Sequence, residues 1–139
     1  MKLNKMLIIA LVVIFSGSVF AQVAVIANKS VSDASLDSKK VEEIYSLKLK
    51  TWSDGKSITL FAYKSDNGTV EKFYSSMGKS SSDMKKLWMK LQLTGEGTAP
   101  EALGSEDEVL NKVASTPGAI GFVDASKVNG NVKVLLTIN

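Results

Sequence analysis

The chain alternates short apolar runs with longer amphipathic segments, and this alternation constrains its fold more than any other feature. The apolar runs have the length of buried strands, and they cover Val23–Ala27, Ile58–Ala62, Ala119–Val123 and Val132–Ile138. The amphipathic segments carry apolar residues at helical spacing, and they begin at Asp37 or Ser38, at Thr69, after Ser80 and after Ser105. Strands that alternate with helices predict an α/β fold, with a mostly parallel sheet flanked by helices.

The first 21 residues have the pattern of a secretory signal peptide. Two lysines precede an apolar run from Met6 to Phe15, and Val19-Phe20-Ala21 places small residues at both positions that favour cleavage after Ala21. The apolar run is too short for a comfortable membrane span. We therefore expect a periplasmic or secreted protein, with a single domain over residues 22–139 and no membrane span in the mature chain.

The composition excludes several kinds of chemistry. The chain has no Cys and no His, which excludes a lipid-modified Cys, disulfides, thiol or imidazole catalysis and the usual zinc sites. All 17 basic residues are Lys, and without Lys2 and Lys5 there are 15 against 14 acids, a net charge of about +1 that does not favour nucleic acid. Because Arg is absent, an anion would be held by N–H groups, hydroxyls and lysines. We expect no metal, cofactor or catalytic residue.

Groups that can bind an oxyanion converge in one segment, between the second predicted strand and the helix that follows it. This segment consists of Lys64, Ser65, Asp66, Asn67, Gly68 and Thr69. The start of a helix has unpaired N–H groups and partial positive charge, and both favour a small anion. The same residue types are also ordinary helix caps and turn formers. The residues alone therefore leave capping and anion binding open.

Other conspicuous residues have simpler explanations. The acidic run Glu106-Asp107-Glu108 follows Ser105 in a capping box, and its carboxylates complement the dipole of the predicted helix better than they suggest a metal site. Gly95-Glu96-Gly97 follows a helix and lacks a third Gly, which indicates a plain loop. Trp52 and Trp88 are expected to pack in the core.

The order of the motifs resembles that of the phosphate-type periplasmic solute-binding proteins, which are ABC transporter components. Residues 23–28 resemble the first strand of one lobe of that family, and Trp52-Ser53-Asp54-Gly55 resembles a turn that follows it. Residues 64–69 are similar to the family's phosphate loop, Arg-Ser-Asp-Gly-Ser-Gly-Thr. The most specific match is Thr116–Val123, which contains Pro-Gly-Ala-Ile-Gly. The resemblance covers nearly the whole mature chain and implies a single lobe of a type II periplasmic-binding-protein-like fold.

This resemblance implies that the loop from Lys64 to Thr69, with Ser65, Asp66, Asn67 and Gly68 between them, binds phosphate or a similar small oxyanion. Asn28, at the end of the first strand, is expected to line the same side. Lys64 stands near the family's Arg and the loop is one residue shorter, so we expect weak binding. The implied partner is a membrane permease or another envelope protein.

Two other functions remain open. In the first, the lobe is a protein-interaction module of the cell envelope that no longer binds phosphate, and an exposed apolar patch on the old ligand face would favour it. In the second, Ser65 and Lys64 form a nucleophile and base, but adjacent residues of an extended segment point to opposite faces. We therefore expect a protein that binds its ligand and is not an enzyme.

Overall fold

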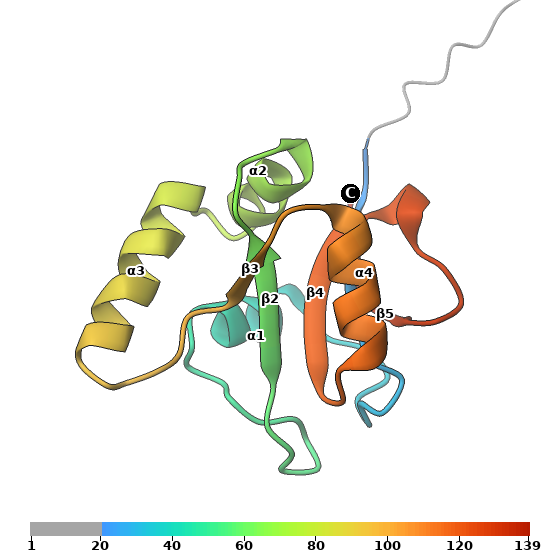
Figure 1. Ribbon diagram of the computed structural model, residues 1–139, viewed down its shortest axis with the longest axis horizontal. Coiled ribbons are helices and arrows are strands. Elements are labelled where there is room, and N and C mark those ends of the chain that lie inside the picture. The colour runs from blue at the N-terminus through green and yellow to red at the C-terminus, as the bar shows by residue number, and fades with distance from the viewer. Residues whose placement is uncertain (1–20) are drawn as a thin grey trace, which may run out of the picture.

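The computed structural model describes residues 21–139, and Figure 1 shows one α/β layer structure within them. Its elements, in chain order, are β1 (Val23–Ala27), α1 (Ser38–Tyr45), β2 (Thr59–Tyr63), α2 (Gly68–Ser75), α3 (Ser81–Leu93), β3 (Glu101–Leu103), α4 (Glu106–Ser115), β4 (Ala119–Asp124), the short 3₁₀ helix η1 (Ala125–Lys127) and β5 (Lys133–Ile138). Apart from Ala21, the predicted signal peptide lies outside the described residues and stays a prediction.

Every predicted strand and helix is present, with ends that differ by one or two residues from those expected. The cap of α1 is Asp37, whose carboxylate accepts the N–H of Lys40 at 2.8 Å. The strand β3 is not indicated by the sequence, because three residues with one buried side chain carry no repeating pattern. Among the described residues, no helix is both long enough and apolar enough to cross a membrane.

The sheet has the strand order β3-β2-β4-β1-β5. β2 runs parallel to β3 and to β4, whereas β1 runs antiparallel to its two neighbours, β4 and β5. Four strands therefore share one direction, which confirms the mostly parallel sheet. The carboxyl ends of these four strands meet at one edge of the sheet, and β1 begins at that same edge and ends at the opposite one.

The last strand does not form a hairpin with β4, although Asn129-Gly130 is a typical hairpin turn. β5 pairs with β1 instead, because β1 occupies the position beside β4. The chain leaves β4 through η1, passes the turn near Gly130 and reaches the far side of β1. The turn that the sequence indicates is present, but it connects strands that are not neighbours.

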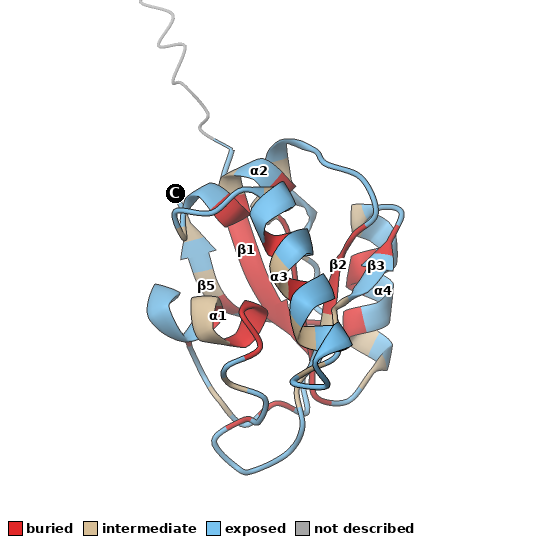
Figure 2. Ribbon diagram, turned by 90° about the vertical axis from the view of Figure 1, so that its left-hand side faces the viewer, coloured by how far each residue is buried: buried red, intermediate tan, exposed pale blue. Residues whose placement is uncertain are grey.

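The two faces of the sheet are covered by different helices, as successive residues of β4 show. Gly121 faces α4, where an added Cβ would lie 2.8 Å from Val109. Phe122 points to the other face, where its ring stacks on Phe73 of α2 at 3.8 Å and meets Tyr45 of α1 edge-on at 5.7 Å. Figure 2 shows β1 buried along its whole length in the middle of this core.

Both tryptophans belong to the core, as predicted. The Nε1–H of Trp52 donates to the carbonyl of Gly118 at 2.9 Å, and that of Trp88 donates to the carbonyl of Tyr45 at 2.7 Å. Each ring is less than a tenth exposed. These bonds tie α1 to α3, and the turn after α1 to the start of β4.

Candidate anion-binding site

A pocket of about 290 Å³ opens at the sheet edge where β4 ends and β1 begins, beside the start of α2. Its wall is formed by Gln22, Val23, Asn67, Gly68, Thr69, Lys72, Glu106 and Asp124, together with Ala21, the last residue of the predicted signal peptide. The carboxyl ends of parallel strands are the edge where ligands bind in α/β proteins. The position of the pocket is therefore the one that the fold favours for a small ligand.

The first turn of α2 gives the pocket a side rich in hydrogen-bond donors. The side chain of Asn67 caps the helix, because its oxygen accepts the N–H of Val70 at 2.8 Å. Within residues 21–139, the N–H groups of Gly68 and Thr69 have no acceptor. Lys72 lies one turn further along the same helix and also lines the pocket, where its ammonium donates to the carbonyl of Ala21. Two free N–H groups and one ammonium group therefore offer partial positive charge to an anion.

The opposite side of the pocket is acidic. The Thr69 hydroxyl donates to Oε1 of Glu106 at 2.7 Å, and the Asp124 N–H donates to the same oxygen at 2.9 Å. The carboxylate of Asp124 accepts the hydroxyl and the N–H of Ser126, and these bonds hold the pKa of Asp124 below its usual value. An anion in the pocket would lie beside two carboxylates as well as beside Lys72.

Half of the predicted loop lies away from the pocket. Lys64, Ser65 and Asp66 are exposed and are not part of its wall. The N–H of Lys64 donates to the carbonyl of Leu103 and extends the pairing of β2 with β3. Asp66 faces α3, where it accepts the hydroxyl of Ser81 at 2.6 Å and lies 3.8 Å from the ammonium of Lys85. The structure brings together Asn67, Gly68 and Thr69 of the predicted set.

Asn28 does not lie on the side of the loop, so that expectation is wrong. Because β1 runs antiparallel to β2 and β4, its carboxyl end lies at the opposite edge of the sheet. There the Nδ2 group of Asn28 donates to the carbonyls of Val113 and Ala114, at 2.8 and 3.0 Å. These are carbonyls at the end of α4, so Asn28 completes the hydrogen bonding of a helix terminus. Its role in the structure is to fix α4 to the sheet.

Three charged residues of the pocket, Lys72, Glu106 and Asp124, were not predicted as site residues. Lys72 could have been found, since it follows Gly68 by four residues and thus shares its helix face. Glu106 and Asp124 come from elements that only the sheet topology brings beside α2. The acidic run does lie in the first turn of α4, as predicted, with the Ser105 hydroxyl accepting the N–H of Glu108 at 3.2 Å. The second bond of the capping box is different, because the Glu108 carboxylate accepts the N–H of Gly104.

The hydroxyls of two buried core tyrosines donate hydrogen bonds to carbonyls of the sheet. The hydroxyl of Tyr63 donates to the carbonyl of Phe122 at 2.6 Å, and that of Tyr45 donates to the carbonyl of Phe61 at 3.0 Å. Burial raises the pKa of both hydroxyls, and the nearby charge of Glu106 adds to the effect at Tyr63. In the described part of the chain, no three metal-ligating side chains lie together.

The sequence and the fold can now be compared with known proteins. A family model described as "PBP superfamily domain" matches residues 16–135. The chain belongs to this family. A comparison with curated proteins found no match.

Several solved structures share this fold. The chain is similar to an ABC-type phosphate transport receptor from Vibrio cholerae, with 18% identity and a TM-score of 0.65 over 83% of this chain and 46% of that protein. A putative phosphate ABC transporter substrate-binding protein with bound phosphate, from Clostridium perfringens, has 17% identity and a TM-score of 0.68, over 83% and 45%. PstS from Borrelia burgdorferi has 15% identity and a TM-score of 0.58, over 84% and 47%. The matched part of the chain spans less than half the length of these proteins.

Proposed function

We propose that this chain is an exported, non-enzymatic solute-binding protein that binds phosphate or a similar small oxyanion weakly. The observation that carries the proposal is the pair of unpaired N–H groups of Gly68 and Thr69, which line one pocket together with Lys72. The names of the structural relatives refer to phosphate transport or phosphate binding, and they support phosphate as the first ligand to test. A permease of the envelope is the partner that such a role implies.

The affinity is expected to be low, with a dissociation constant on the order of millimolar or weaker. The donors are two N–H groups and one ammonium on a flexible stem, without the paired donors of a guanidinium. Glu106 and Asp124 place negative charge in the same pocket. The pocket is also open to water, which weakens each charge interaction.

The sharpest test removes one donor and leaves the helix intact. Gly68 is the first residue of α2, a position where Pro is tolerated, and an added Cβ there meets nothing within 4 Å. Asn67 has the extended backbone that a residue before Pro requires. Gly68→Pro therefore deletes one unpaired N–H, whereas Gly68→Ala keeps it and serves as the matched control.

The measurement is a titration with phosphate, followed through the backbone amide shifts of the ¹⁵N-labelled protein purified after export. We expect phosphate to shift the Gly68 and Thr69 signals in the wild-type protein. Gly68→Ala should bind like the wild type, and Gly68→Pro should bind about tenfold more weakly or worse, since a hydrogen bond to a charged group contributes about 1.5–3 kcal/mol. Equal affinities of the two variants, or no shift at any of these signals, would contradict the proposal.

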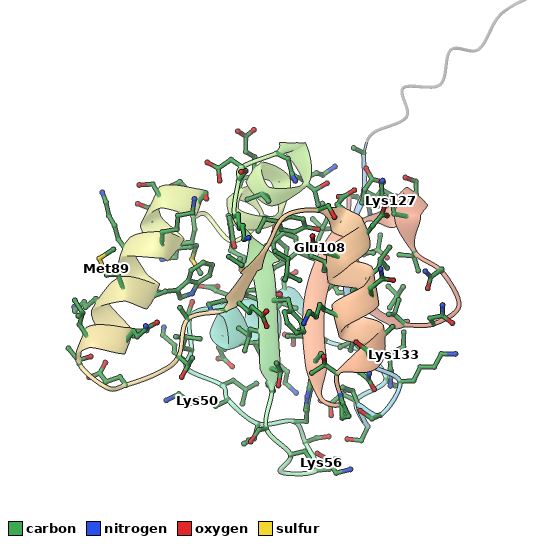
Figure 3. The ribbon with its side chains drawn as sticks, in the orientation of Figure 1. Lys50, Lys56, Met89, Glu108, Lys127 and Lys133 are labelled. Carbon is green, nitrogen blue, oxygen red and sulfur yellow. The ribbon has the colours of Figure 1, made fainter. Side chains whose placement is uncertain are left out.

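The second candidate, an interaction module, is favoured by an apolar patch on α3. Met89 is 65% exposed and Leu93 is 83% exposed, one turn further along the helix. They border a groove of about 310 Å³ with Trp88 and Ala99. Figure 3 shows Met89 projecting from the outer side of α3, away from the sheet. None of these residues lines the anion pocket, so the patch is not on the face where the sequence analysis expected it.

The charge around this patch indicates its partner. Lys85, Lys86 and Lys90 are exposed on the same helix, so the complementary surface would be an envelope protein with apolar residues inside an acidic rim. Affinity capture from envelope extract, with the wild-type protein and with Met89→Ser/Leu93→Ser as baits, tests this function. If both baits capture such a partner in equal amounts, the patch does not bind it and its proposed role is refuted.

A further inference from the structure

The carboxylate of Glu106 lies on the acidic side of the pocket, where it accepts two hydrogen bonds and lies near one ammonium group. Its Oε1 accepts the Thr69 hydroxyl at 2.7 Å and the Asp124 N–H at 2.9 Å. Its Oε2 lies 4.0 Å from the ammonium of Lys127, and the side chain is only 15% exposed. Figure 3 shows Lys127 at the end of α4 where that helix begins. Glu106 is therefore a largely enclosed charged group of the pocket wall with three named partners.

These three partners, two hydrogen-bond donors and one nearby positive charge, are of the kinds that a free oxyanion would need in a chain without Arg. They are a hydroxyl, a main-chain N–H and an ammonium, and they come from α2, from the end of β4 and from η1. A carboxylate and a small oxyanion are both negative acceptors of about the same hydrogen-bond length, so they compete for the same donors. In particular, the Thr69 hydroxyl that the family resemblance assigns to phosphate is bonded to Glu106.

We propose that Glu106 is the residue that determines the affinity of this pocket, because its carboxylate serves as a built-in anion. It occupies the Thr69 hydroxyl and repels a second negative charge bound at the N–H groups of Gly68 and Thr69. An external oxyanion binds fully only when the Glu106 side chain turns away from the pocket. This inference rests on the proposed function, since it assumes that the pocket accepts an anion.

The substitution that isolates the charge is Glu106→Gln. The Gln side chain has the same shape, and its Oε1 can still accept the bonds from Thr69 and Asp124. Glu108→Gln is the matched control, because it makes the same change in net charge two residues further along α4. The Glu108 carboxylate accepts the N–H of Gly104 at 3.0 Å and does not line the pocket. A purely structural role of Glu106 would leave phosphate affinity unchanged in both variants.

The experiment is a calorimetric phosphate titration of the wild-type protein and both variants, each purified after export from the full sequence. We expect Glu106→Gln to bind phosphate at least about tenfold more tightly than the wild type, since two like charges a few Å apart repel strongly in a partly enclosed site. Glu108→Gln should stay within about twofold of the wild type, because an exposed charge further away is screened.

Each outcome separates the two proposals. If Glu106→Gln binds phosphate more tightly than the wild type and Glu108→Gln does not, the result supports this inference. If the wild type then shows no measurable binding, only the proposed function of the native chain fails. Equal binding by the wild type and Glu106→Gln overturns the inference and leaves the proposed function standing. Absence of binding in both, up to about 50 mM phosphate, overturns both.

A second variant covers the case in which Glu106→Gln folds poorly. Glu106→Ala removes the carboxylate and leaves its donors free, so added acetate should bind in its place and raise the Tm. The rise in Tm with acetate is expected to be larger for Glu106→Ala than for the wild type and for Glu108→Ala. The same rise in all three proteins would be a general salt effect and would overturn the inference.

Discussion

Replacing Gly118 with Ala is expected to destabilise the fold by about 2–5 kcal/mol, because two costs fall on one residue. Gly118 has a φ of 74°, a left-handed conformation that costs other residues about 1–2 kcal/mol. A Cβ at this position would lie 2.6 Å from the carbonyl oxygen of Ser57, and such crowding costs about 1–3 kcal/mol more. The carbonyl of Gly118 accepts bonds from Trp52 and Thr59, which limit any local shift.

Three other Gly→Ala variants separate these two costs. Gly55 has a φ of 84° with nothing within 4 Å, so its variant shows the conformational cost alone. Gly121 has an ordinary φ, but its Cβ would lie 2.8 Å from Val109, so its variant shows crowding alone. Gly130 has neither feature, and its variant should stay within about 1 kcal/mol of the wild type.

The assay is urea unfolding of the four variants, with the free energy of unfolding taken from the midpoint and slope. The expected order of destabilisation places Gly118→Ala first and Gly130→Ala last. If Gly118→Ala were no more destabilising than Gly55→Ala, the Ser57 carbonyl would have to move freely, and the crowding argument would be refuted. If Gly118→Ala and Gly130→Ala had the same free energy of unfolding, both the conformational cost and the crowding cost at Gly118 would be refuted.

Three further predictions follow from the contacts of single residues. Asn28→Ala should lower the free energy of unfolding by about 1–3 kcal/mol, because it leaves the end of α4 unpaired, and phosphate titration should show unchanged affinity. Lys72→Gln should weaken phosphate binding more than Lys64→Gln does, because only Lys72 lines the pocket, and a larger effect of Lys64 in the same titration would contradict this. Hydrogen bonds from neighbouring serines hold the pKa of three aspartates below its usual value, and these are Asp33, Asp83 and Asp124. The stabilisation that these three bonded carboxylates contribute is present above the unfolded pKa of about 3.9 and is lost as the pH falls through the lower folded pKa. Urea unfolding at a series of pH values should therefore show a free energy of unfolding that falls below about pH 4. A free energy that does not change with pH in this range would count against these bonds.

Local sequence patterns predict most of the fold because each element carries its own signal. The five apolar residues of β1 indicate a buried strand, and Ser and Asp residues at 37–38, 80–83 and 105 indicate the starts of α1, α3 and α4 without any tertiary information. The direction of β1 could not be predicted in this way, because a parallel strand and an antiparallel strand can have the same apolar run. One expectation failed for this reason, because Asn28 at the end of β1 lies at the edge of the sheet opposite to the loop.

The candidate site was predictable only where one helix contains it. Asn67, Gly68 and Thr69 are adjacent in the chain, and the start of a helix imposes their chemistry. Lys64 and Asp66 look equivalent to them in the sequence, but one extends a strand and the other faces α3. The opposite wall comes from Glu106, whose place beside α2 depends on the order of β2 and β4 in the sheet, which no local pattern encodes.

The position of β1 also has a consequence for when the protein can fold. β1 is the first described strand, yet both of its hydrogen-bonded neighbours, β4 and β5, are formed by the last part of the chain. Pairing across such a long stretch of sequence is slow, because the loop must close before any contact forms. β1 therefore stays unpaired until β4 and β5 have been synthesised. A chain with this order of assembly would remain open during its synthesis, which is the state that export in an unfolded form requires.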